Sequence, residues 1–172
     1  CPEDFTRPMM APVPGTGPAA RARTTAEGGG GTIAALRRWR GAQKGPVILV
    51  PTMGALHSGH RKLLEVARAE NDVVVTSIFV NPTQFAPNED FSRYPRDFER
   101  DLAMLAAAGV DAVFHPDAAE MYPPGFSTTI SLAGPAAAGL EDRFRPTHFQ
   151  GVATVVAKLL IQAAPDVAVF GE

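Results

Sequence analysis

The segment that most constrains the fold of this chain is the decapeptide 51–60, PTMGALHSGH. It follows an apolar run, PVILV at 46–50, which is short, rich in β-branched residues and typical of a buried β-strand. It precedes residues 61–70, whose apolar positions fit one side of a helix. We therefore expect a strand-to-helix loop at the carboxyl end of a strand, where open α/β sheets bind their ligands.

The residue types of this loop suit a nucleotide. Gly54 and Gly59 allow a tight turn and a close approach by a ligand. Ser58 stands where it can cap the helix, whose N-terminus offers free N–H groups and a positive dipole to an anion. His57 and His60 share a face at helical spacing, and two imidazoles there can stabilise the charge that develops when pyrophosphate leaves. The competing interpretation is a pair of ordinary surface histidines.

Composition narrows the class of protein. The 172 residues are 45% hydrophobic and 20% charged, which is typical of a globular domain with a proper core. The net charge of −2 gives no indication of a general nucleic-acid binder or a binder of anionic membranes. Cys1 is the single cysteine, so an internal disulfide is excluded, and no apolar run approaches the roughly 20 residues of a membrane span.

The order of the expected elements predicts the fold class. Residues 1–30 are rich in Pro, Gly, Ala and Thr, and we expect a disordered leader. Apolar runs at 73–80, 111–115 and 166–170 predict further strands, and the strand–helix–strand order requires parallel pairing. Residues 31–172 are therefore expected to form one Rossmann-like α/β domain, a parallel sheet flanked by helices.

Four further elements are expected. Helices are predicted at 32–40, capped by Thr32, and at 97–108, capped by Asp97. Residues 127–132 are expected to form a short strand. The helix predicted at 152–163 is apolar nearly all round, so it should lie under the sheet or against a second subunit.

Two polar segments are candidates for substrate or metal binding. Asn81 and Gln84, in NPTQF, follow the second central strand, and their amides can bind a carboxylate or hydroxyl without adding a charge. The alternative is a plain polar turn. Downstream acids form a candidate magnesium cluster, although most of them are expected to be solvated or capping residues: Glu89, Asp90, Asp97, Glu99 and Asp101.

Several separate motifs together resemble one family. PTMGALHSGH contains the H-x-G-H signature of the nucleotidyltransferase superfamily, and SIFVNPTQF, the YPR loop at 94–96, RPTHFQGV and FGE follow it in order. With these flanks the sequence resembles the pantothenate synthetase (pantoate–β-alanine ligase) family over residues 44–172. The resemblance implies adenylation of pantoate by ATP with release of pyrophosphate, followed by attack of β-alanine to give pantothenate and AMP. It also implies Mg²⁺ with the ATP, a homodimer and a cytoplasmic location.

The resemblance assigns roles to individual residues. It makes His60 and His57 catalytic, with His60 the preferred proton donor, and it places Asp101 near the metal. The implied nucleotide-binding residues are Met53, Gly54, Ala55, Leu56, His57, Ser58, Gly59, His60 and Gly171. The implied substrate-binding residues are Gln84, Asn81, Thr52, Met53, Tyr94, Arg145 and His148, the last two with a structural role as an equal alternative. His115, before a proline, is expected to be structural.

The sequence also departs from the family. Its last residues, Gly171 and Glu172, are followed in the family by Lys-Asp and by a smaller C-terminal domain. We therefore expect the N-terminal domain with the C-terminal domain absent. Two alternatives remain open: a catalytically impaired nucleotide-binding fragment, and another adenylyltransferase of the same superfamily, against which NPTQF argues.

Overall fold

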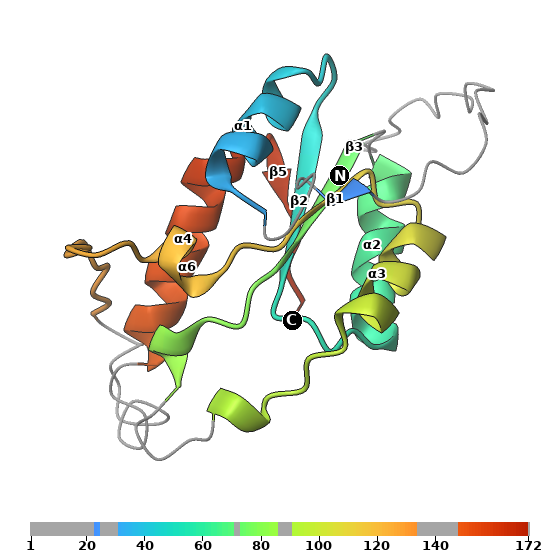
Figure 1. Cartoon of the computed structure of the whole chain (residues 1–172). Coiled ribbons are helices and arrows are strands. Elements are labelled where there is room, and N and C mark those ends of the chain that lie inside the picture. Colours follow the sequence, from blue (N-terminus) through green and yellow to red (C-terminus); the bar gives the residue numbers. More distant parts are fainter. Residues whose placement is uncertain (1–22, 25–30, 71–72, 86–90, 134–147, 172) are drawn as a thin grey trace, which may run out of the picture.

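The fold is a parallel β-sheet covered by helices on both faces (Figure 1). A computed structural model of the chain describes residues 23–24, 31–70, 73–85, 91–133 and 148–171. Five strands pair in the order β1-β4-β3-β2-β5, and every pairing is parallel. Their bounds are β1 Arg23–Thr24, β2 Val47–Thr52, β3 Val73–Ile78, β4 Ala112–Phe114 and β5 Val167–Ala168. The predicted fold class is confirmed.

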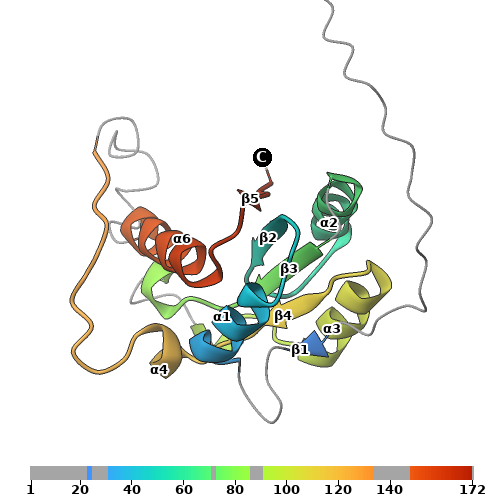
Figure 2. The same cartoon turned by 90° about the horizontal axis from the view of Figure 1, so that it is seen from above.

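Two pairs of helices cover the sheet (Figure 2). Helices α1 (Ile33–Gly41) and α6 (His148–Ala163) lie on one face, and α2 (Ser58–Glu70) and α3 (Phe98–Ala107) lie on the other. Three short elements complete the described part of the chain: the 3₁₀ turns η1 (Pro82–Gln84) and η2 (Phe91–Arg93), and the helix α4 (Ala118–Met121).

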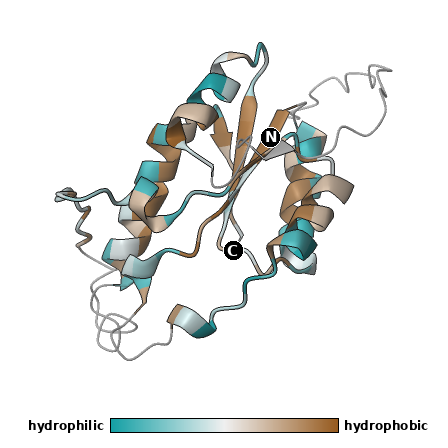
Figure 3. Ribbon diagram, viewed as in Figure 1, coloured by the Kyte–Doolittle hydropathy of each residue, from teal (hydrophilic) through white to brown (hydrophobic). Residues whose placement is uncertain are grey.

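The strands are apolar on both faces because each face carries its own core (Figure 3). Leu49 of β2 packs into a cluster that includes Leu36 of α1 and Leu159 of α6. Its neighbour Val50 points to the opposite face, into a cluster that includes Leu64 of α2. Because successive side chains of a strand point to opposite faces, each face of the sheet packs against its own pair of helices.

The pairing register brings two loops together. Thr52, the last residue of β2, is paired with Ile78, the last residue of β3. The segments that follow, beginning at Met53 and Phe79, therefore leave the sheet at the same carboxyl edge. This register places the decapeptide loop beside the NPTQF segment, as the sequence predicts.

Some expected boundaries were wrong. Residues 127–132 form no strand; instead the Ile130 N–H donates to Thr154 Oγ1 of α6 at 3.0 Å. Helix α6 begins at His148 rather than at 152. Within the expected leader, Arg23–Thr24 pair with β4, while residues 1–22 and 25–30 lie outside the described part. None of the helices described is both long and apolar enough to span a bilayer.

Candidate active site

The loop between β2 and α2 turns through a left-handed backbone. Gly54 and Ala55 have φ angles of 79° and 51°, a region that glycine adopts freely and alanine rarely does. Thr52 supports the turn, because its hydroxyl donates to the Ser77 carbonyl at 2.8 Å and accepts the Gly54 N–H at 3.2 Å. The turn brings His57 to the start of α2, exposed at the edge of the sheet.

The two histidines cap the helix reciprocally. His57 Nδ1 accepts the backbone N–H of Gly59 at 3.1 Å, and His60 Nδ1 accepts the backbone N–H of His57 at 3.4 Å. This is the arrangement of a capping box with imidazoles in place of the usual side chains. His57, and not Ser58 as expected, therefore provides the cap, while Ser58 is the exposed first residue of α2.

Capping also sets the tautomers. Because both Nδ1 atoms accept backbone N–H groups, each neutral ring carries its proton on Nε2. The ring centroids lie 4.1 Å apart. Burial lowers the pKa of His60, the neighbouring His57 lowers it further, and Asp101 opposes both effects. The pair thus offers imidazole N–H donors at a helix N-terminus, which is a suitable environment for phosphate oxygens.

The second loop is organised by the side chain of Asn81, which is 1% exposed. Its Oδ1 accepts the Tyr122 hydroxyl at 2.9 Å and the Thr83 hydroxyl at 3.0 Å, and its Nδ2 donates to Gln84 Oε1 at 3.2 Å. Asn81 therefore holds this loop, and its role in substrate binding stays a prediction.

The amide nitrogen of Gln84 has only a weak hydrogen-bond acceptor. With Oε1 bound to Asn81, its Nε2 points to the sulfur of Met53 at 2.7 Å. A thioether is a weak acceptor, so a substrate oxygen can replace it without loss. The two loops, 51–60 and 81–84, thus present Met53 and Gln84 to the same space.

The start of α6 packs directly against the backbone of the second loop. His148 Nδ1 lies 2.9 Å from the carbonyl oxygen of Gln84. A Cβ at Gly151 would lie 2.4 Å from the carbonyl oxygen of Thr83, so only glycine permits this approach. Of the two roles weighed for His148, the described contact is the structural one; Arg145 lies outside the described residues.

A cavity of about 410 Å³ lies between these elements. Its polar lining includes His60, Gln84 and Tyr94, and its apolar wall comes from α6. Burial, with a smaller contribution from the charge of Asp101, raises the pKa of the Tyr94 hydroxyl, so it is a neutral hydrogen-bonding group here. The full lining is Pro51, Thr52, Met53, His60, Phe79, Gln84, Tyr94, Val152, Val155, Val156, Leu159 and Phe170.

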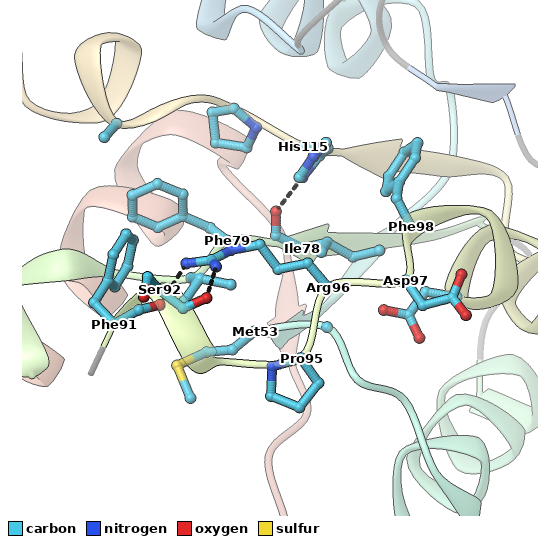
Figure 4. A pocket seen from close by; sticks show the side chains of 15 residues that line it. Met53, Ile78, Phe79, Phe91, Ser92, Pro95, Arg96, Asp97, Phe98 and His115 are labelled. Carbon is cyan, nitrogen blue, oxygen red and sulfur yellow. Dashed lines mark hydrogen bonds between the residues drawn. The ribbon is translucent and has the colours of Figure 1, made fainter. Parts of the chain in front are cut away.

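A second cavity, of about 400 Å³, lies beyond Met53 and Phe79, which line both (Figure 4). Its rim includes Arg96, whose guanidinium donates to the carbonyl oxygens of Phe91 and Ser92 at 2.8 and 3.2 Å. His115 lines it as a strand-end residue, with Nδ1 2.8 Å from the Ile78 carbonyl oxygen, in agreement with the expected structural role. We assign this cavity no ligand.

The position of Asp101 argues against its expected role beside a metal. Its side chain is 2% exposed, and its two oxygens accept the backbone N–H groups of Ala55 and Leu56, each at 2.8 Å. Both oxygens are thus engaged by the backbone, although Asp101 also lines the second cavity. No group of three or more metal-ligating side chains occurs within the described residues. The chain thus offers no ready-made magnesium cage in that part.

Two residues predicted to bind the nucleotide, Leu56 and Gly171, have other surroundings in the structure, and the sequence did not predict a role for Tyr122. Leu56 turns its side chain into the core, and Gly171 is exposed, with its nearest non-adjacent side chain that of Leu63. Tyr122, which orients Asn81, was not identified from the sequence. It lies in the segment 121–126, MYPPGF, in which no local pattern indicates that the tyrosine reaches back across 41 residues to Asn81.

With this geometry in place, the comparisons with known proteins are decisive. Residues 31–172 match the family profile described as Pantoate-beta-alanine ligase. The chain belongs to the pantoate–β-alanine ligase family. A pantothenate synthetase of Bradyrhizobium sp. (strain BTAi1) is 64% identical over 131 residues, covering 76% of this chain and 46% of that protein. One from Roseiflexus sp. (strain RS-1) is 61% identical, covering 82% of this chain and 50% of that protein.

Solved ligases of the family share the fold. The pantothenate synthetase of Thermus thermophilus superposes with a TM-score of 0.75 at 54% identity, covering 80% of this chain and 49% of that one. The ligase of Francisella tularensis, complexed with beta-gamma ATP and β-alanine, gives a TM-score of 0.76 at 42% identity, covering 80% of this chain and 54% of that one. The chain thus spans about half the length of the pantoate–β-alanine ligases that it matches.

Proposed function

We propose that this chain forms the ATP- and pantoate-binding part of a pantoate–β-alanine ligase. In the first step a carboxylate oxygen of pantoate attacks the α-phosphorus of ATP, and the bond from that phosphorus to pyrophosphate breaks. In the second step the amine of β-alanine attacks the acyl carbon, and AMP leaves. The products are pantothenate, AMP and pyrophosphate, so the enzyme is an AMP-forming carbon–nitrogen ligase.

The observation that carries this proposal is the meeting of His60 and Gln84 at one cavity. His60 stands in the first turn of α2, where an imidazole Nε2–H and the helix dipole both favour phosphate. Gln84 presents an amide N–H to the same space, where it can bind a hydroxyl or carboxylate without pairing it with a full charge. A carboxylate bound in this way keeps its nucleophilicity.

The shape of the cavity suits pantoate. Val152, Val155 and Val156 of α6 give this cavity an apolar wall, which suits the two methyl groups of that substrate. Thr52, Met53 and Tyr94 line the same cavity. We assign pantoate to the α6 side and the phosphates of ATP to the side of His57, Ser58 and Gly59.

Magnesium accompanies ATP in this proposal as part of the substrate. Within the part of the chain described, Asp101 is engaged by the loop of the decapeptide 51–60, here called the nucleotide loop, and no cluster of three ligating side chains exists. Mg²⁺ prefers phosphate oxygens and water with one or two carboxylates, so the phosphates themselves can hold it. The ATP complex of the Francisella relative supports ATP as the nucleotide.

We further propose a cytoplasmic homodimer. Ile130 and Ile161 are 39% and 71% exposed and line one groove, which Ile33 and Phe126 extend. An apolar groove of this kind is suited to contact with a second copy. Sedimentation of wild-type chain and of Ile161→Glu tests it: the wild type should be dimeric and the variant monomeric. A wild-type monomer at tens of micromolar would contradict the dimer.

The decisive experiment is ATP–pyrophosphate exchange by the purified chain, with and without pantoate. We expect exchange that requires pantoate and falls about 100-fold or more in His60→Gln, the loss typical of removing one transition-state donor. Glutamine at this position keeps an acceptor for the His57 N–H, so the variant preserves the helix cap. Lys62→Ala, on the exposed face of α2, is the control and should retain wild-type exchange.

The same assay separates the two alternatives. ATP binding without exchange would identify a nucleotide-binding fragment that lacks turnover. Exchange that proceeds equally well without pantoate would indicate another adenylyltransferase of the superfamily. The second result would overturn the ligase proposal, and the first would limit this chain to the nucleotide-binding part of the enzyme.

A further inference from the structure

We propose that Asp101 is a positioning residue whose buried carboxylate holds the backbone of the nucleotide loop ahead of His57. The link spans two elements far apart in sequence, because Asp101 belongs to α3 and its partners, Ala55 and Leu56, lie 46 and 45 residues earlier. The functional part of this inference rests on the proposed function, whereas the anchoring itself does not.

The geometry of the anchor is bidentate. Oδ2 accepts the Ala55 N–H and Oδ1 accepts the Leu56 N–H, both at 2.8 Å. Both distances lie within the range for charge-assisted N–H···O bonds. At 2% exposure the carboxylate has little access to water, so these two donors carry much of its solvation. The Asp101 carboxylate and the two backbone N–H groups of the loop therefore provide each other's hydrogen-bond partners.

The loop needs such a partner because of its conformation. Gly54 and Ala55 are both left-handed, and a turn of this kind points successive N–H groups in the same direction. Without Asp101 the two donors would face a partly buried site with no acceptor. A Cβ at Gly54 would lie 3.0 Å from Asp101 Oδ2, which shows how closely the acid packs beneath the turn.

The anchor joins the loop to the segment before α3. Asp97 caps α3 by accepting the Arg100 N–H at 3.1 Å, and it follows directly after the Tyr94–Arg96 segment that borders both cavities. One turn further on, Asp101 ties this helix to the nucleotide loop. The position of His57 and His60 is thus set from α3 as well as from β2.

Amide hydrogen exchange of the purified chain tests the anchor directly. In the wild type, the Ala55 and Leu56 amides should exchange at least about tenfold more slowly than in an unfolded peptide. Exchange at the unfolded rate would overturn the proposal without any variant. In Asp101→Asn one donor would face the Nδ2 group, so at least one amide should exchange about tenfold faster, the factor that 1.4 kcal/mol produces.

Two controls separate anchoring from general stability. Glu99→Gln removes a charge from the same exposed first turn of α3 and should leave both amides unchanged. The Val50 amide, within β2, reports global opening and should keep its wild-type rate in Asp101→Asn. If amide exchange in Asp101→Asn becomes faster at Val50 by the same factor as at Leu56, Asp101 stabilises the whole fold and the positioning role is overturned.

ATP affinity, measured by calorimetry on the same three proteins, tests the consequence. We expect Asp101→Asn to bind ATP at least about tenfold more weakly, pantoate affinity to change less than threefold, and Glu99→Gln to match the wild type. Unchanged ATP affinity in an Asp101→Asn chain whose loop amides exchange faster would overturn the positioning role. A wild type that binds no ATP would refute the proposed function, while the amide rates would still decide whether the anchor exists.

Discussion

His57 and His60 cap the first turn of α2 for one another, each through Nδ1, with their rings 4.1 Å apart. The residues that the proposed chemistry requires are therefore also the residues that start the helix. This double use raises a practical difficulty, because replacing either histidine can change both the stability of the helix and the binding of phosphate. Variants that retain the cap resolve it.

The two roles of His57 can be separated by comparing alanine with asparagine. His57→Ala loses the acceptor for the Gly59 N–H and should lower the free energy of unfolding by about 0.5–2 kcal/mol. His57→Asn supplies a preferred capping side chain, so its free energy of unfolding should be close to that of the wild type. Both should lose ATP–pyrophosphate exchange, since neither has the imidazole. Urea denaturation gives the stabilities; a His57→Asn chain with full exchange would show that the imidazole is dispensable.

The pKa of His60 should lie below its ordinary value of 6.5, chiefly because the ring is buried. His57→Gln removes the second cause, so the pKa should rise toward 6.5 without reaching it. NMR titration of the imidazole measures both values. No change in the variant would show that His57 does not act electrostatically on His60.

This shift also sets a pH dependence of stability. A histidine with a lowered pKa in the folded chain binds its proton more readily when the chain is unfolded. The contribution of neutral His60 to stability should therefore be fully present above pH 6.5 and decline as the pH falls from 6.5 through the folded-state pKa. His60→Gln should lack this component in urea denaturation series across that range. If the free energy of unfolding of His60→Gln depends on pH in the same way as that of the wild type, this prediction is wrong.

Gly151→Ala tests the close contact between α6 and the second loop. The added Cβ would meet the Thr83 carbonyl at 2.4 Å, so the loop must move, and we expect a loss of about 1–3 kcal/mol in the free energy of unfolding. Pantoate affinity should fall as Gln84 shifts. Gly41→Ala, in α1 with no atom within 4 Å of the new Cβ, is the matched control and should be neutral or slightly stabilising. Equal changes in the free energy of unfolding in Gly151→Ala and Gly41→Ala would show that the contact with Thr83 is not the cause.

Tyr122→Phe removes a single hydroxyl from the network around Asn81. We expect a loss of about 0.5–1.5 kcal/mol in stability, the net value of one hydrogen bond. The Gln84 amide should also become less ordered, which NMR relaxation of its side-chain NH₂ group can detect. Pantoate affinity should fall while ATP affinity is retained. A Tyr122→Phe chain with reduced ATP affinity and unchanged pantoate affinity would contradict this role of Tyr122.

Much of the fold could be predicted from sequence because its signals are local. The apolar runs that became β2 and β3, the capping residues Thr32 and Asp97, and the loop glycine Gly54 each depend on neighbouring residues or on a single backbone angle. The position of the decapeptide beside NPTQF followed from parallel pairing alone. The apolar runs and the strand–helix–strand order thus determined the architecture and the edge where the site lies.

The roles of Asp101, Asn81 and Tyr122 were decided only by the tertiary structure. Each acts through a hydrogen bond to a residue 41 or more positions away, and no local pattern encodes such a partner. The acid expected beside a metal became the support of a turn, and the expected substrate ligand became the centre of a network. The sequence by itself determined which chemical groups reach the carboxyl edge of the sheet. Packing decided which of them face the cavity and which hold the others in place, because most buried polar side chains take their hydrogen-bond partners from within the fold.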